Sequence, residues 1–403
     1  MTYDVAAVRA RFPALAEGAA HFDGPGGSQV PVDVAEAVAA VMLAAVANRG
    51  RVTAAERRAD LVVTDARLAV ADLLGAQPQG VVFGRSMTQL TYDLARALAK
   101  DWGPGDEVVV TRLDHDANIR PWVQVAGAVG ATVRWADFDR ETGVLPVEAI
   151  ADLLTPKTRL VAVTAASNLL GTQPDIPAIT AAARAAGALT YVDGVHHTPH
   201  ALVDVKALGA DFYACSQYKF LGPHMGTVVA DPALLETIRP DKLLPSSDAV
   251  PERFELGTLP YELLAGSTAA IEFMANLVPG DGTRRERLTR SLAALHEHET
   301  ALLDRLETGL RALPNVLVYG DPRRPRTATV LFTVDGVAPA AVYERLALAG
   351  VNAPASHFYA IECARWLGIE ATGAVRAGIA PYTDVSDVDR LLTALVDIAQ
   401  DIT

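Results

Sequence analysis

A single lysine stands among aromatic and apolar residues in the stretch CSQYKFLGPHMG, residues 215–226. Lys219 lies between Tyr218 and Phe220 and follows an apolar run that is typical of a buried strand. Because removal from water disfavours the ammonium form, an amine held there can attack a carbonyl carbon and form a Schiff base. A lysine whose stem only covers apolar surface would give the same local pattern. Lys219 alone therefore indicates a candidate nucleophile and no more.

Two further features complement this lysine. Asp193 ends the apolar run LTYVD, and open α/β sheets bind ligands at the carboxyl ends of their strands, although an Asp-Gly pair can also simply cap a turn. Ser86 and Gln89 form the S-x-x-Q pattern of a helix start, whose free amides bind phosphate and whose second helical residue is Thr88. Taken alone, this pattern is only a helix cap. Together the three features meet the needs of pyridoxal phosphate: an amine for its aldehyde, a carboxylate for its ring nitrogen and a cup for its phosphate.

The elements around these residues alternate through the first 230 positions. Short β-rich runs begin at residues 81, 107, 132, 159, 189 and 211, and the stretches 86–100 and 176–187 have helical spacing. This alternation predicts an α/β fold in which a mostly parallel sheet lies between helices. After residue 260 the pattern predicts helices at 264–277, 283–313, 338–349 and 386–402, and strand-like runs at 326–336 and 374–382. We expect a large domain over residues 15–260 and a smaller α+β domain built from residues 1–14 and 261–403.

The composition of the 403 residues argues against several classes of function. Lys and Arg total 35 against 48 acidic residues, and a net charge of -13 opposes binding to nucleic acid or to anionic membranes. The longest apolar run, residues 37–47, has 11 residues. A membrane helix needs about 20, so this run predicts a buried helix instead. The N-terminal segment lacks a basic region followed by a long apolar one, and we therefore expect a cytoplasmic protein.

Metal chemistry is not predicted. Cys215 and Cys363 are too few and too far apart in the sequence to suggest a disulfide framework or a zinc ribbon. The trio His196, His197 and His200 invites a metal site, but adjacent histidines usually diverge and no matching acidic or cysteine cluster follows.

A series of motifs resembles the class V aminotransferase family of fold-type I pyridoxal phosphate enzymes, within it the cysteine desulfurase and selenocysteine lyase branch. FDGPGGSQVP is similar to LDNAATTQ.P, LDHDANIRPW to MEHHANIVPW, and SNLLGTQPDI to SNVLGT..PI. YVDGVHHTPH is similar to DGAQAVPH, CSQYKFLGPHMG to FSGHKLYGPTGIG, RFELGT to RFEAGT, and AVRAGIAPYTDVSDVDRL to RASFAPYNT.EEVDRL. Order and spacing agree as well as residue type. The resemblance implies the fold-type I architecture, a large domain with a mostly parallel seven-stranded sheet between helices and a smaller C-terminal α+β domain.

The resemblance assigns cofactor roles to several residues. Lys219 would form an imine with the cofactor aldehyde and then move the proton at the substrate Cα, while Asp193 would keep the pyridine nitrogen protonated. His115 would stack on the face of the ring and could relay protons. His196 stands where the family has a glutamine that contacts the phenolic oxygen, a role that an imidazole N–H can also fill. The residues implied to hold the phosphate are Met87, Thr88, Ser216, Tyr218 and, from the neighbouring subunit, Thr258.

Other positions imply how the substrate is held. Arg376 and Asn168 would bind its carboxylate, Arg376 through a planar fork of two donors. Gly26 and Gly27 belong to a GPGG that replaces the family's NAAT, and glycine there lets the backbone approach a ligand closely. The resemblance also implies a small amino-acid substrate and a homodimer whose active site is shared between the subunits.

The resemblance fails at one catalytic position. In the family's loop RTGHHCAQP the cysteine thiolate attacks the substrate sulfur, whereas the aligned stretch PASHFYAIECARWLG has Tyr359 there. Cys363 lies four residues later in a predicted helix, either as a structural residue or as a displaced nucleophile. Without a positioned thiol we expect a C–S lyase that works by α,β-elimination, with Tyr359 acting as an acid or lining the pocket. This loss also argues against a sulfur-acceptor protein as a partner.

Three alternatives stay open. The first is an amino-acid epimerase of the isopenicillin N epimerase type, and the second is a true cysteine desulfurase that uses Cys363. The third is a protein that binds the cofactor without catalysis, although such a protein would not require Arg376.

Overall fold

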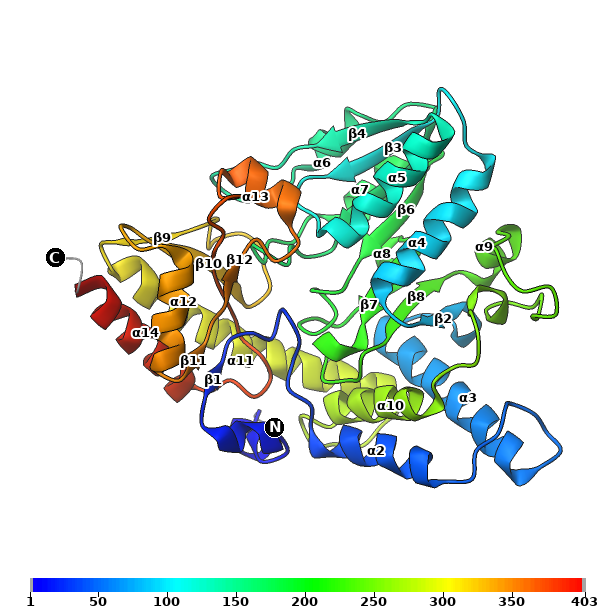
Figure 1. Cartoon of the computed structure of the whole chain (residues 1–403), viewed down its shortest axis with the longest axis horizontal. Coiled ribbons are helices and arrows are strands. Elements are labelled where there is room, and N and C mark those ends of the chain that lie inside the picture. Colours follow the sequence, from blue (N-terminus) through cyan, green and yellow to red (C-terminus); the bar gives the residue numbers. More distant parts are fainter. Residues whose placement is uncertain (1–2, 401–403) are drawn as a thin grey trace.

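A seven-stranded sheet forms the centre of the larger part of the molecule in this computed structural model, which describes residues 3–400 (Figure 1). Its strands are, in spatial order, β2 (Val81–Gly84), β8 (Gly226–Ala230), β7 (Phe212–Ser216), β6 (Leu189–Asp193), β5 (Thr158–Thr164), β3 (Glu107–Thr111) and β4 (Thr132–Ala136). Only β8 runs opposite in direction to the other six strands. The predicted α/β class and the mostly parallel seven-stranded sheet are confirmed.

Apolar side chains alternate along the central strands between two clusters, one on each face of the sheet. Val109 and Val161 point into one cluster, which includes residues of α3 (Ala54–Leu74) and α7 (Ile176–Ala185). Val108 and Leu160 point into the other, which includes residues of α4 (Met87–Leu98) and α5 (Arg120–Val129). Because both faces are covered, these strands are apolar at nearly every position rather than at every second one.

The smaller part contains a four-stranded antiparallel sheet in the order β12 (Ala355–Ser356), β13 (Ala374–Gly378), β10 (Thr329–Val334) and β9 (Val316–Val318). The helices packed with it are α11 (Arg284–Ala312), α12 (Pro339–Leu348) and α14 (Val385–Gln400). Near the start of the chain, β1 (Ala20–His21) pairs with β11 (Val351–Asn352). Segments from both ends of the sequence therefore lie together here, as Figure 1 shows. The remaining short helices are α1 (Val5–Arg9), α6 (Val147–Ala151), α8 (Val205–Leu208), α9 (Pro232–Thr237) and α13 (Ile361–Leu367).

The exact domain limits, 15–260 for the large domain and 1–14 with 261–403 for the small one, stay a prediction. Helix α10 (Tyr261–Ala275) packs against α2 (Val32–Leu43) and α3. Its residues Leu264 and Ile271 belong to the apolar cluster of the large sheet. Along α11, Leu288 and Leu295 still belong to that cluster, whereas Leu306 belongs to the cluster of the small sheet.

The prediction of a buried helix over residues 37–47 is wrong. Helix α2 ends at Leu43, and among its residues only Val34 is buried. Met42 and Leu43 are 71% and 89% exposed in the single chain. One side of α2 lies on α10, while the apolar side chains at its C-terminal end are largely exposed in the single chain. Within residues 3–400, no helix is long and apolar enough to cross a membrane.

Candidate active site

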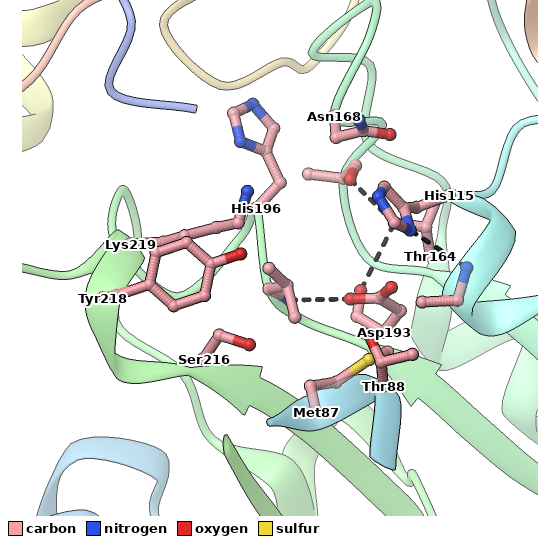
Figure 2. A pocket seen from close by; sticks show the side chains of 13 residues that line it. Met87, Thr88, His115, Thr164, Asn168, Asp193, His196, Ser216, Tyr218 and Lys219 are labelled. Carbon is pink, nitrogen blue, oxygen red and sulfur yellow. Dashed lines mark hydrogen bonds between the residues drawn. The ribbon is translucent and has the colours of Figure 1, made fainter. Parts of the chain in front are cut away.

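The carboxyl ends of the parallel strands meet at one edge of the large sheet, and a pocket opens there (Figure 2). The residues that line it follow five strands: β2, β3, β5, β6 and β7. They are Met87, Thr88, His115, Ala117, Thr164, Ala166, Asn168, Asp193, Val195, His196, Ser216, Tyr218 and Lys219. The sheet topology thus brings together most of the site residues predicted from sequence.

Lys219 ends a short 3-10 turn (Gln217–Lys219) directly after β7. Its amine donates a hydrogen bond to the Pro25 carbonyl and lies 5.4 Å from the centre of the Tyr218 ring. Burial lowers the pKa of this amine to about 7, and the positive charge of Arg376 acts in the same direction. Asp193 opposes this shift. Lys219 lines the pocket. Near neutral pH, an appreciable fraction of the molecules carries this amine in its neutral, nucleophilic form.

Asp193 is the last residue of β6, the strand beside β7. Burial raises the pKa of its carboxyl to about 6, while the backbone N–H of Val195, which donates to Oδ1 at 2.9 Å, lowers it. A Cβ on Gly194 would lie 1.9 Å from Cζ of Tyr213, so only glycine fits there. Asp193 thus caps a turn and also lines the pocket, so that both interpretations of the Asp-Gly pair apply.

The first turn of α4 lines the same pocket as the short turn that carries Lys219. The Ser86 hydroxyl accepts a hydrogen bond from the Gln89 amide at 3.1 Å, which confirms the predicted helix start. A Cβ on Gly226 would lie 2.1 Å from the Met87 nitrogen, so the first residue of β8 presses directly against this turn. The turn is thereby held where its free amides and the hydroxyl of Thr88 face the pocket.

Two histidines complete the pocket, His115 half-buried and His196 buried. Nδ1 of His115 accepts a hydrogen bond from the Ala117 amide at 3.0 Å, and burial together with Lys219 and Arg376 lowers the pKa of His115 to about 3. Nε2 of His196 lies 3.0 Å from a hydroxyl of the small sheet, and its buried Nδ1 has no hydrogen-bond partner among the described residues. Burial holds the pKa of His196 well below its usual value. Both rings are therefore neutral near pH 7.

The substrate-binding residues predicted from sequence also lie together. Arg376 on β13 is fully buried, and its Nη1 donates to the Asn168 carbonyl at 2.8 Å. Within residues 3–400 it forms no ion pair, and its Nε has no partner. A Cβ on Gly26 would lie 3.6 Å from its Nη2, and one on Gly27 would lie 3.4 Å from Cδ2 of Tyr218. A buried guanidinium without an anion is a suitable site for a ligand carboxylate.

The loop before α13 covers this guanidinium. The Phe358 ring stacks on Arg376 at 3.8 Å, and the Phe358 carbonyl accepts a hydrogen bond from Nδ2 of Asn168 at 3.0 Å. Tyr359 is 72% exposed and stacks on His115 with 5.8 Å between ring centres. Both loop residues have left-handed backbones, with φ of 51° and 58°, an uncommon geometry for bulky residues that clusters at functional sites. Tyr359 therefore lies at the mouth of the site, above the pocket residues.

Neither cysteine belongs to this pocket. Cys363 is fully buried on α13, where burial and the charge of Asp114 raise the pKa of its thiol. Cys215 is fully buried on β7, where burial raises the pKa of its thiol to about 12. Thr258 lies on an exposed loop outside the pocket of its own chain.

Sequence reasoning missed the groups that reach the site from the small sheet and the loops next to it. Thr327 and Thr329 contact His196, and Phe358 covers Arg376. No local motif marks the threonines, because they lie more than 130 residues from the histidine that they touch.

The pocket as a whole suits pyridoxal phosphate. It offers an amine whose pKa is lowered, a buried carboxylate, an open helix N-terminus and a histidine nitrogen that is buried without a partner. These are the groups that the aldehyde, the ring nitrogen, the phosphate and the phenolic oxygen of this cofactor require.

Comparison with known proteins agrees with this fit. The family model described as Aminotransferase class-V matches residues 20–391. The chain is 37% identical to the Mycobacterium tuberculosis protein MT3887 over 401 residues, which is 99% of this chain and 100% of that protein. It is 33% identical to a probable cysteine desulfurase of Pseudomonas aeruginosa, covering 96% of each.

Among solved structures, the chain superposes on the cysteine desulfurase CsdA of Escherichia coli with a TM-score of 0.87 and 28% identity over the full length of both chains. This likeness confirms the fold-type I architecture. The chain belongs to the class-V aminotransferase family, and it is a pyridoxal phosphate-dependent enzyme.

Proposed function

We propose that the enzyme cleaves the Cβ–S bond of a sulfur-bearing amino acid by α,β-elimination. The observation that carries this proposal is the placement of the thiols. Tyr359 occupies the position aligned with the desulfurase cysteine, and both cysteines of the chain are fully buried outside the pocket. A buried thiol with a raised pKa stays protonated and is a poor nucleophile. These facts support a reaction without a persulfide on the protein.

Lys219 and Asp193 would carry the proton chemistry. When bound, pyridoxal phosphate supplies an electron sink that stabilises negative charge at the substrate Cα. The Lys219 amine, with its pKa near 7, would take the proton from Cα. The Asp193 carboxylate would hold a proton at the pyridine nitrogen, and His115 would lie against the face of the ring. The low pKa of His115 keeps that contact neutral.

The other residues of the site would bind the cofactor phosphate and orient the substrate. The amides near Met87, the hydroxyls of Thr88 and Ser216 and the phenol of Tyr218 would hold the phosphate. Arg376 and Asn168 would hold the substrate carboxylate, next to Gly26 and Gly27.

Tyr359 would protonate the departing sulfur. Elimination removes one proton from Cα and releases a thiolate from Cβ, and water then converts the remaining fragment to a keto acid and ammonia. The net reaction consumes one water and yields one thiol, one keto acid and one ammonium ion. Tyr359 is exposed at the mouth, stacked on His115, where a leaving group bound to Cβ would pass.

The same site supports a homodimer in which the partner completes the phosphate cup. Thr258 and its neighbour Leu256 lie on an exposed loop, and the apolar end of α2 is uncovered. Thr258 does not line the pocket of its own chain. A second copy that covered these surfaces would place Thr258 of one subunit beside the pocket of the other.

The reaction is tested by incubating the loaded enzyme with cysteine, cystine and S-substituted cysteines, and by measuring keto acid, thiol or sulfide, and the D-enantiomer of each substrate. We expect equimolar keto acid and thiol, with a Cys363→Ser variant retaining the wild-type rate. Formation of D-amino acid without keto acid would show epimerisation. Loss of sulfur release in Cys363→Ser, with a persulfide on that residue in the wild type, would show a true desulfurase.

A further inference from the structure

Two threonine hydroxyls, one on the first residue of β10 and one on the loop just before it, converge on one nitrogen of His196. Oγ1 of Thr327 and Oγ1 of Thr329 each lie 3.0 Å from Nε2. All three side chains are buried, and the other ring nitrogen, Nδ1, is buried without a partner. His196 and Lys219 line the same pocket, and Figure 2 shows the imidazole next to the end of the lysine side chain. One edge of the ring is thus held by hydroxyls, while Nδ1 is free to meet a bound molecule.

A neutral histidine has one N–H and one bare nitrogen, so the partner of Nε2 decides what Nδ1 offers. A backbone carbonyl or a carboxylate beside Nε2 would draw the proton to that nitrogen and leave Nδ1 as a lone pair. A hydroxyl can donate, and it therefore allows Nε2 to stay bare while Nδ1 carries the proton. His196 is neutral, because burial and the nearby His200, Arg376 and Lys219 all disfavour its charged form.

The hydroxyl of Thr327 has a second acceptor within reach, the Gly171 carbonyl, whose oxygen has two lone pairs and can accept two hydrogen bonds. The Gly171 carbonyl lies 3.3 Å from this hydroxyl, and it accepts the Thr327 backbone N–H at 2.9 Å. The Thr327 hydroxyl can therefore donate to this carbonyl or to Nε2, which lies 3.0 Å away. The Thr329 hydroxyl has no hydrogen-bond partner other than Nε2 among residues 3–400, so its proton is available to that nitrogen. Thr329 contacts Nε2 at the same distance. Either hydroxyl can supply the single proton that a bare Nε2 accepts.

We propose that Thr327 and Thr329 are positioning residues that keep the proton of His196 on Nδ1, so that this N–H donates to the phenolic oxygen of the cofactor. The inference rests on the proposed cofactor contact of His196 and is independent of the reaction that follows. A glutamine amide always presents an N–H and needs no such partner, whereas a histidine at this position does. Because Thr329 begins β10 of the small sheet, Thr327 lies just before it and His196 follows β6, the contact also connects the small sheet to the cofactor site.

The protonation state can be observed directly by nitrogen-15 NMR of the holoenzyme labelled at histidine, with His196→Gln used to identify the signal. We expect a proton on Nδ1 and a bare Nε2. A proton on Nε2, in a sample whose absorption spectrum shows bound cofactor, would overturn the proposal. No substrate is present, so this result is separate from success or failure of the elimination assay.

A double-mutant cycle tests the role of the hydroxyls. The pH at which the visible band of the bound cofactor changes is measured for Thr327→Val/Thr329→Val, for His196→Gln and for the three changes combined. Loss of a donor leaves the phenolic oxygen's charge less stabilised, so the adjoining nitrogen keeps its proton to higher pH. We expect the threonine changes to raise the midpoint by about one pH unit when His196 is present. In the His196→Gln background we expect no further rise.

An equal rise of the midpoint in both backgrounds would show that the threonines act only through the fold. No rise in either background would show that they do not influence the cofactor, and would overturn the proposal. Thr333→Val, on β10 with Thr329 but outside the site, is the matched control and should leave the midpoint unchanged. Thermal unfolding of each variant shows whether the fold is intact.

Discussion

Lys219 and Asp193 carry opposite pKa shifts, and both shifts predict how the stability of the cofactor-free enzyme depends on pH. The lysine pKa falls from 10.5 to about 7 on folding, so the unfolded chain binds more protons between these values and stability should rise with pH across that window. The aspartate pKa rises from 3.8 to about 6, so the folded chain binds more protons there and stability should fall as pH rises from 4 to 6.

Replacing Lys219 or Asp193 alone should remove its own contribution to the pH dependence of stability. Lys219→Met should stabilise the cofactor-free enzyme at pH 7 by roughly 1–3 kcal/mol, less than the full pKa difference because the side chain is partly exposed. Asp193→Asn should flatten the change between pH 4 and 6. Urea unfolding at several pH values measures both effects. An unchanged slope between pH 7 and 10 in Lys219→Met would contradict the lowered lysine pKa.

Phe358 should control how well Arg376 binds a carboxylate. Its ring lies on the guanidinium at 3.8 Å and shields it from water. We expect Phe358→Ala to raise KM for the amino acid by about five- to tenfold, with a much smaller change in kcat. Phe358→Leu keeps apolar cover without the aromatic face, and should fall between the wild type and the alanine variant. Steady-state kinetics give the split, and an unchanged KM in Phe358→Ala would show that the ring does not orient the clamp.

At the scale of elements, the contact between β8 and α4 positions the turn that we propose binds the cofactor phosphate. A Cβ on Gly226 would meet the Met87 nitrogen at 2.1 Å, so Gly226→Ala must displace the first turn of α4. We expect cofactor affinity to fall at least about tenfold, because the backbone amides of the turn would no longer point at the phosphate. Gly127→Ala on α5, where a methyl group would meet nothing within 4 Å, is the matched control and should bind normally. Spectrophotometric titration with pyridoxal phosphate measures both, and equal affinities would contradict this role of the contact.

The elements most accessible to sequence reasoning are those whose signal is local. The six strands predicted from apolar runs are all present, and their order along the chain placed Asp193 and Lys219 at strand ends of one sheet edge. Strand β8 was not among them, because its short run GTVVA follows the lysine turn without a helix between. Whether the apolar end of α2 is buried depends on what packs against it. The contact of Thr329 with His196 depends on packing between the two sheets. Neither has a sequence signal of its own.

At the scale of the whole molecule, the exposed apolar end of α2 predicts a dimer with a shared site. We expect Met42→Glu/Leu43→Glu to shift the enzyme toward monomers and to weaken cofactor binding, because Thr258 of one copy would no longer complete the cup of the other. Leu348→Glu on α12, where the side chain is 90% exposed, is the control and should leave both properties unchanged. Light scattering coupled to size-exclusion chromatography gives the mass. A wild-type monomer with full cofactor affinity would contradict the shared site.

The most direct test of the account is to find the amine that holds the cofactor. Borohydride reduction of the loaded enzyme fixes the cofactor to its lysine, and peptide mass spectrometry then locates the added mass. We predict the modification on Lys219 in the wild type, and none in Lys219→Ala treated in the same way. A modification on another lysine, or none in a wild-type sample that binds the cofactor, would contradict the site described here and every role derived from it.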